Sequence, residues 1–131
     1  VGELFYGMGL PFFPLQAGLR GVPEPAIGLL LASHAAGALL GALTTPATLR
    51  TTAPTSALRR TLLLMAFSSS TAALAGGLPA THGLAFAVLI GAARFGYGYG
   101  AGVNLVVAQA LLFLLCQTPR EAAACLAALA A

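Results

Sequence analysis

The side chain that most constrains the chemistry of this sequence is Arg94. It is the single charged residue in an apolar stretch of 33 residues, 83–115. In hydrocarbon an ionised side chain costs from about 2.5 to more than 10 kcal/mol unless protein groups or water surround it. We therefore expect Arg94 to face the interior of a helical bundle. Two interpretations remain open: the arginine serves a polar interior, or it is a packing residue bonded to backbone carbonyls.

Glycines follow Arg94 at spacings that matter for helix packing. Gly98 and Gly102 lie four and eight residues further on, on the same helical face as the arginine, and Gly100 lies between them. Because glycine has no side chain, a neighbouring helix can approach this face closely. We expect these glycines to be helix-packing residues.

A second ridge of small residues lies earlier in the chain, where Ser33, Gly37 and Gly41 recur at intervals of four. His34 is next to this ridge. Its imidazole could carry protons, or it could be a neutral group hydrogen-bonded within the bundle. The four hydroxyls at 68–71 could likewise line a wet pathway or bond back to carbonyls of their own helix.

The residue pattern does not indicate catalysis, metal binding or phosphate binding. No nucleophile stands beside a histidine–acid pair, and there is no metal-binding set and no phosphate loop, so we expect neither an enzyme nor a cofactor. Cys116 and Cys125 lack metal spacing and are interpreted as small apolar helix residues, with a disulfide as the alternative. The chain begins at Val1 and ends in an alanine-rich run, which we interpret as a processed product or fragment. No secretory signal is visible.

The composition predicts a membrane protein. Of 131 residues, 59% are hydrophobic and 7% charged, whereas soluble domains have about 25% charged residues. The net charge of +3 comes from arginine, and Arg50, Arg59 and Arg60 crowd one gap. We interpret this basic balance as membrane topology and lipid contact, and not as nucleic-acid binding.

We expect these residues to be held by an all-α, polytopic membrane bundle in a single domain, 1–131. Apolar runs predict four transmembrane helices and the start of a fifth, at about 4–17, 27–46, 61–78, 83–115 and 120–131. A helix of 33 residues would be about 50 Å long, so it must tilt or protrude. Glycines and prolines at 18–26 predict a surface loop.

The charged gaps predict which ends of the helices share a side. The gap at 46–60 carries three arginines and should face the cytoplasm or an equivalent compartment. Arg120, two crossings later, should lie on the same side. Arg20 and Glu24 should lie on the opposite side.

Three sequence elements follow one another along the chain in a characteristic order. The first is YGMGLPFFPLQAGLRGVPEPAIGLLLASHAAGALLGA, similar to a proline-broken first helix followed by a glycine-initiated second helix. The second is RFGYGYGAG at 94–102, which resembles an arginine-x-x-x-Gly-x-Gly-x-Gly motif. The third is TPRE at 118–121. Together and in this order, the three elements resemble the amino-terminal half of a major facilitator superfamily transporter, of the drug/proton antiporter or vesicular amine transporter branch.

Two departures separate this chain from the family pattern. The gap PATLRTTAPTSALRR has Pro46 near the expected glycine and lacks the family's acidic latch residue. Such transporters also have twelve helices in two halves, with substrate bound between them near the midplane. This chain would supply one wall of that cavity.

The resemblance implies a transporter that moves a small organic solute by alternating access with proton coupling. Its partners would be membrane lipid, a solute or proton, and a second half-transporter or other membrane subunits. The residues it nominates are Gln16, Arg94, Asn104, Phe12 and Phe13 for the cavity wall and Arg50, Arg59 and Arg60 for a cytoplasmic gate. The alternative is a transport-inactive remnant of this fold that serves as a structural subunit of a larger membrane complex. A channel-like or lipid-binding role is a third possibility.

Overall fold

The computed structural model describes residues 12–115, and the regular secondary structure in this range is α-helical. The four helices are α2 (Phe12–Leu19), α3 (Glu24–Leu49), α4 (Pro54–Gly76) and α5 (Gly83–Leu115). The predicted all-α class is confirmed for these residues. The predictions for residues 4–11, for the two cysteines, for Arg120 and for the helix at 120–131 lie outside the described range.

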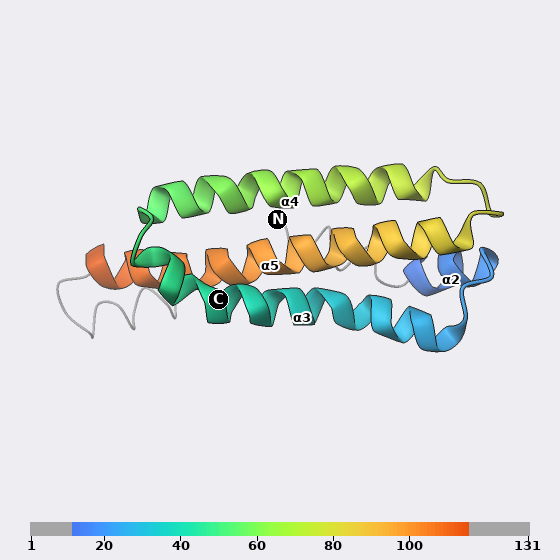
Figure 1. The fold of residues 1–131 in the computed structure, drawn as a ribbon, viewed down its shortest axis with the longest axis horizontal. Helices are drawn as coiled ribbons and strands as arrows, with labels where there is room; N and C mark the ends of the chain where they lie inside the picture. Colours follow the sequence, from blue (N-terminus) through green and yellow to red (C-terminus); the bar gives the residue numbers. More distant parts are fainter. Residues whose placement is uncertain (1–11, 116–131) are drawn as a thin grey trace.

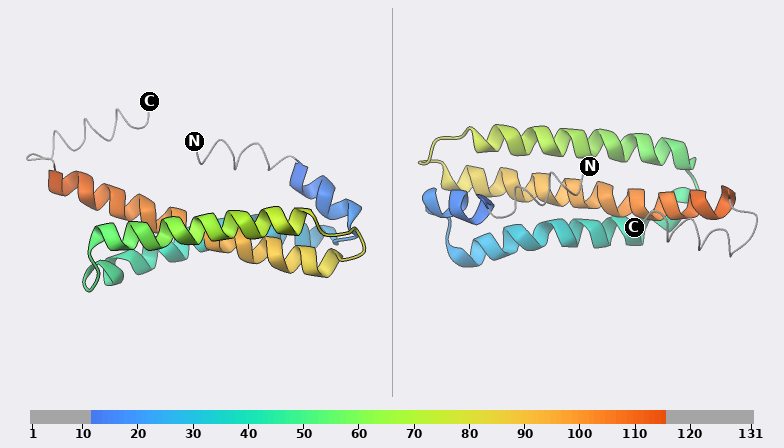
Figure 2. Two further views of the ribbon diagram at one scale, coloured as in Figure 1. Left: turned by 90° about the horizontal axis from the view of Figure 1, so that it is seen from above. Right: turned by 180° about the vertical axis from the view of Figure 1, so that it is seen from behind.

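The long helices form a layer with α5 in the middle (Figure 1). α5 packs along both α3 and α4, which touch each other only slightly. α3 and α5 run in the same direction and α4 runs in the opposite one (Figure 1). The short α2 lies beside the beginning of α5, near the α2–α3 and α4–α5 loops (Figure 2). The helix that contains Arg94 is thus the central helix of the fold.

Glycines bring α3 and α5 into backbone contact. A β-carbon added at Gly98 would overlap the carbonyl oxygen of His34, and one added at Gly102 would overlap that of Ala38. From the other helix, β-carbons at Gly37 and Gly41 would overlap the α5 carbonyls of Phe95 and Tyr99 respectively. This spacing leaves room for Cα–H···O contacts and for little else.

The neighbouring glycines of α5 face α4 instead. A β-carbon at Gly96 would lie 2.6 Å from Oγ of the buried Ser68, and one at Gly100 would lie 2.5 Å from Cγ of Met65. Alternate glycines of α5 therefore serve different partners. This arrangement lets one helix approach two neighbours closely at the same level.

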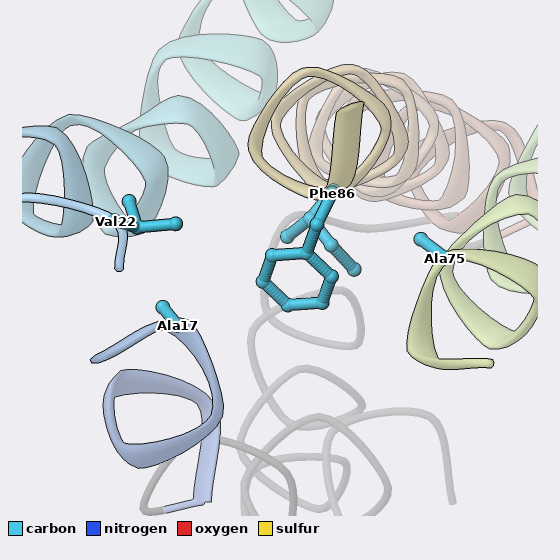
Figure 3. Packing of buried hydrophobic residues seen from close by; sticks show 5 residues of the cluster. Ala17, Val22, Ala75 and Phe86 are labelled. Carbon is cyan, nitrogen blue, oxygen red and sulfur yellow. The ribbon is translucent and has the colours of Figure 1, made fainter. Parts of the chain in front are cut away.

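A small apolar core closes the end of the bundle that carries α2. Its buried members are contributed by α2, α4, α5 and the α2–α3 loop: Ala17, Val22, Ala75, Phe86 and Ile90 (Figure 3). Ala17 and Val22 also make the hydrogen bonds that end α2, since Val22 N–H donates to the Ala17 carbonyl at 3.1 Å. Gly21 adopts the left-handed conformation, φ 70°, that this helix termination requires.

The break between α3 and α4 is shorter than the expected gap at 46–60. α3 continues through Pro46 to Leu49, and α4 begins at Pro54. A proline in the first turn of a helix has no hydrogen bond to lose, and Pro46 lies close enough to the end of α3 to interrupt only its last turn. Arg59 and Arg60 are therefore helical residues.

Two of the described helices, α3 and α5, are long and apolar enough to cross a membrane by length and composition. Four spans, which the sequence predicts, are not supported. α2 has 8 described residues, and the hydroxyls and two arginines of α4 make it less apolar than its neighbours. Length and composition alone do not separate such helices from the core helix of a soluble protein.

The outer faces of the bundle are apolar and exposed. Only 11% of the most apolar window of α3 and 28% of that of α5 are buried. The most exposed large side chains come from α2, α3, α4 and α5: Leu19, Leu29, Phe67, Leu74, Leu84 and Leu114. A soluble core helix would bury most of such a window, whereas the described residues leave these faces uncovered.

Candidate functional site

Arg94 is half-buried and makes its described contacts with two other helices. Its Nε donates a hydrogen bond of 3.0 Å to the carbonyl oxygen of Leu30 in α3. Its guanidinium carbon lies 5.3 Å from the ring centroid of Phe13 in α2. Of the predicted cavity residues, these two, Arg94 and Phe13, are brought together. The bond to Leu30 is the kind that the packing interpretation expects.

Phe13 links Arg94 to two further side chains, Phe86 and Arg20. The Phe13 ring lies 6.2 Å from the Phe86 ring, with an angle of 20° between their planes. The guanidinium carbon of Arg20 lies 4.5 Å from the Phe86 centroid. Each of the two stacked phenylalanine rings thus contacts one arginine. Each arginine gains the attraction of a cation for an aromatic face, about 0.5–2 kcal/mol per contact.

His34 and Tyr97 lie about one helical turn from the hydrogen bond between Arg94 and Leu30. His34 comes four residues after Leu30, and Tyr97 comes three residues after Arg94. Their ring centroids are 6.0 Å apart, and both residues are half-buried. His34 comes from α3 and Tyr97 from α5. Together with Arg94 they form a set of three polar side chains, here called the mid-helix polar cluster, inside two helices that are long and mostly apolar.

Asn104 lies away from this cluster. It is ten residues after Arg94, which corresponds to about 15 Å along the helix axis. Its amide oxygen accepts a short hydrogen bond from the buried Thr61 hydroxyl, and its Nδ2 lies 3.3 Å from Sδ of Met65. Both partners are in α4. In this structure Asn104 therefore joins α4 to α5 and has no described contact with Arg94.

Gln16 also contacts other groups than Arg94. Its side-chain oxygen and its backbone carbonyl each accept a hydrogen bond from NH1 of Arg20, both at 3.2 Å. Phe12 begins α2, and its side chain lies outside the described part of the structure. The five predicted cavity residues therefore do not form one described group.

The hydroxyl row of α4 divides into two parts. Ser69, Ser70 and Thr71 bond back to the carbonyls four residues earlier, at 2.9–3.0 Å. Ser68 is buried against Gly96 of α5. Of the two interpretations of this row, the back-bonded one describes the three residues after Ser68. Such bonds satisfy the hydroxyls without water.

The predicted gate residues Arg50, Arg59 and Arg60 are exposed. Arg50 follows the last residue of α3, and Arg59 and Arg60 lie in the first two turns of α4. The α3–α4 loop lies at the end of the bundle opposite to the α2–α3 loop, which contains Arg20 (Figure 1). No acidic residue of the described range lies near them in sequence, the nearest being Glu24 at the start of α3. As the sequence analysis expects, the basic gap and Arg20 occupy opposite ends.

Three residues with specific contacts were not nominated from the sequence: Arg20, Phe86 and Thr61. A basic residue followed by glycine at the end of a helix is a signal for Arg20, because cations are favoured near helix C-termini. Phe86 and Thr61 give no such signal. Their importance follows from which helix faces meet.

Within residues 12–115 no group of three or more histidine, cysteine, aspartate or glutamate residues is arranged to hold a metal ion. Comparison of the chain with models of protein families, with curated proteins and with solved structures gave no match. Its function must be inferred from its own residues.

Proposed function

We propose that this chain is a membrane-embedded helical domain and that it forms one wall of a pathway for a small organic solute. The observation that carries the proposal is the mid-helix polar cluster of Arg94, His34 and Tyr97. Arg94 lies about 17 Å from the beginning of α5, close to half the thickness of a hydrocarbon core of about 30 Å. An intramembrane charge at that depth is costly, and charged residues in membrane spans mark substrate or ion pathways in many membrane proteins.

The exposed apolar faces support the membrane part of the proposal. α3 and α5 leave most of their apolar windows uncovered, on the sides away from the helix contacts. Lipid chains would cover these faces at no cost in ordered water. The polar cluster, by contrast, lies where helices meet.

α4 would accompany α3 and α5 into the membrane. It has 23 residues, or about 35 Å, and it packs along α5. The hydroxyls that make it less apolar are satisfied by its own carbonyls at Ser69, Ser70 and Thr71. We therefore propose three crossings for the described residues, with α2 packed at one end of them.

The transport mode in this proposal comes from the resemblance to the amino-terminal half of major facilitator transporters. That resemblance implies alternating access, proton coupling and a second half that faces this one across the cavity. A guanidinium barely deprotonates, so Arg94 would not itself carry the proton. It would act by organising water or by stabilising a charge on a neighbouring group.

The test is transport by the protein reconstituted in vesicles with an internal pH-sensitive dye. The probes are the organic cations ethidium and tetraphenylphosphonium and a panel of small amines. We expect a pH gradient to drive accumulation of at least one probe by the wild type and by Ser69→Ala, and not by Arg94→Ala. Equal accumulation by wild type and Arg94→Ala would contradict the assigned role of Arg94.

A second candidate function is that of a structural subunit in a larger membrane complex. The observation that favours it is the Arg94–Leu30 bond, since a backbone carbonyl is the partner that a packing arginine takes. In the vesicle assay this candidate predicts no accumulation of any probe by wild-type protein that is correctly inserted. Purification from its native membrane would then yield a stable complex with other subunits.

A further inference from the structure

Arg20 makes contacts that join two loops and two helix ends. Its NH2 donates to the carbonyl of Gly76 at 2.9 Å and to that of Leu78 at 3.2 Å, and its NH1 donates to Gln16. Gly76 is the last residue of α4, and Gln16 is in the last turn of α2. The last carbonyls of a helix have no partner within it, and the helix dipole favours a cation there. One guanidinium thus satisfies the ends of two helices.

The same side chain lies on the apolar core. Its guanidinium carbon lies over the Phe86 ring, 4.5 Å from the ring centroid, and Phe86 is 2% exposed. Phe86 in turn stacks on Phe13 of α2. The third nitrogen of Arg20, Nε, is buried and has no hydrogen-bond partner within residues 12–115. The guanidinium is therefore held in position by the hydrogen bonds of NH1 and NH2 and by the Phe86 ring.

Within residues 12–115, α2 makes few helix–helix contacts and touches α3 and α5 only slightly. Its eight described residues have little helical stability of their own, so the position of this segment depends on tertiary contacts. The contacts described for it are Ala17 in the small core, the Phe13–Phe86 stack, the Arg94–Phe13 contact and the Arg20 bonds.

We propose that Arg20 is a latch that pins α2 to the α4–α5 loop and so determines where Phe13 lies beside Arg94. Arg20 is in this sense a positioning residue for Arg94, acting through Phe86 and Phe13. With the latch formed, α2 closes the bundle end opposite to the arginine-rich gap. With it open, α2 and the Phe13 ring move away from Arg94. This inference concerns the position of α2 and stands whether or not the chain moves a solute.

The first test measures the position of α2 by distances between spin labels, in protein reconstituted in nanodiscs. Labels at the exposed positions Leu15 and Leu84 report on α2 against α5, after Cys116 and Cys125 are replaced by serine. We expect Arg20→Gln to lengthen and broaden this distance distribution. Arg20→Lys should do the same, because an ammonium lacks the planar fork that spans the Gln16 and Gly76 sides.

Two controls keep this test decisive. Arg60→Gln removes an exposed arginine at the other end and should leave the distribution unchanged. A second label pair at the exposed positions Leu39 and Leu105 reports on α3 against α5 and should not change with Arg20→Gln. An unchanged Leu15–Leu84 distance in Arg20→Gln would overturn the latch. So would a change in both label pairs, since Arg20 would then be a general folding residue.

The positioning role has its own test, a double-mutant cycle on thermal unfolding in detergent. Arg20→Gln and Arg94→Gln are compared singly and together. We expect the combined loss in Tm to be smaller than the sum of the single losses, because both act on the Phe13–Phe86 stack. In a Phe13→Leu background the two losses should become additive. If the two losses in Tm were additive with Phe13 present, the positioning role would be contradicted. Arg20 would then stabilise only its own surroundings.

Discussion

The Nε of Arg94 donates its hydrogen bond to the Leu30 carbonyl at the same helical register at which Gly98 meets His34 and Gly102 meets Ala38. Four-residue steps on α5 thus match four-residue steps on α3, which runs in the same direction. Arg94 lies on the same line of α3–α5 contacts as Gly98 and Gly102. At the level of Arg94 the contact is a side-chain hydrogen bond to the Leu30 carbonyl, in place of the close backbone approach at the two glycines.

The glycine contact between α3 and α5 predicts a steep cost for small additions. Gly102→Ala should destabilise the protein by about 1–3 kcal/mol, because the new methyl group must push two backbones apart. The measurement is thermal or denaturant unfolding in detergent. Gly28→Ala is the matched control in α3, since a β-carbon there meets nothing within 4 Å. It should be neutral or stabilising by up to about 1 kcal/mol. Equal effects of the two substitutions would contradict the close approach.

The contact between Thr61 and Asn104 predicts coupled energetics across α4 and α5. Thr61→Val should cost about 1–3 kcal/mol, because it leaves the half-buried amide of Asn104 without its hydroxyl donor. Thr61→Val combined with Asn104→Leu should cost less than the two singly. Thr71→Val, whose hydroxyl bonds only to its own helix in this structure, should cost much less. Strict additivity in the Thr61–Asn104 pair would count against the bond.

The geometry of the Arg94 bond predicts that lysine cannot replace arginine. Arg94→Lys keeps the charge and loses the Nε–H donor to the Leu30 carbonyl, so unfolding should become easier by about 1.5–3 kcal/mol. Arg60→Lys, at an exposed position, is the control and should change stability by less than about 0.5 kcal/mol. If Arg94→Ala lowered the stability and Arg94→Lys were as stable as the wild type, the charge of Arg94 and not the geometry of its hydrogen bond would determine stability.

The exposed apolar faces predict sensitivity to outward charges. Leu43, 68% exposed on α3, would face lipid chains in the proposed membrane arrangement. Leu43→Arg should reduce membrane insertion, since a central arginine costs about 2.5–3.5 kcal/mol on insertion scales. Alkaline extraction of membranes and a glycosylation-site assay measure this. The control Leu43→Phe should insert like the wild type. Full insertion of Leu43→Arg would argue that this face is not in hydrocarbon.

Much of the helical layout could be predicted from residue patterns. The long apolar run at 83–115 coincides with α5, because a continuous apolar stretch without internal prolines has no alternative to a helix. The prolines, glycines and charges at 18–26 predict a loop at the right place but too long, since α2 continues to Leu19 and α3 begins at Glu24. The boundary at 46–60 was misjudged, because proline is tolerated near a helix end and at a helix start, and neighbouring contacts decide which applies.

The all-helical class, the isolated charge of Arg94 and the small-residue faces can be predicted from the residues alone, since these depend on composition and on a fixed helical period. Which helix each face meets is known only from the three-dimensional structure. It placed α5 between α3 and α4, gave Asn104 to Thr61, and put Arg20 at the joint ends of α2 and α4. The physical reason is that a period fixes the angles of side chains around one helix. The pairing of helices depends on contacts between residues far apart in the chain.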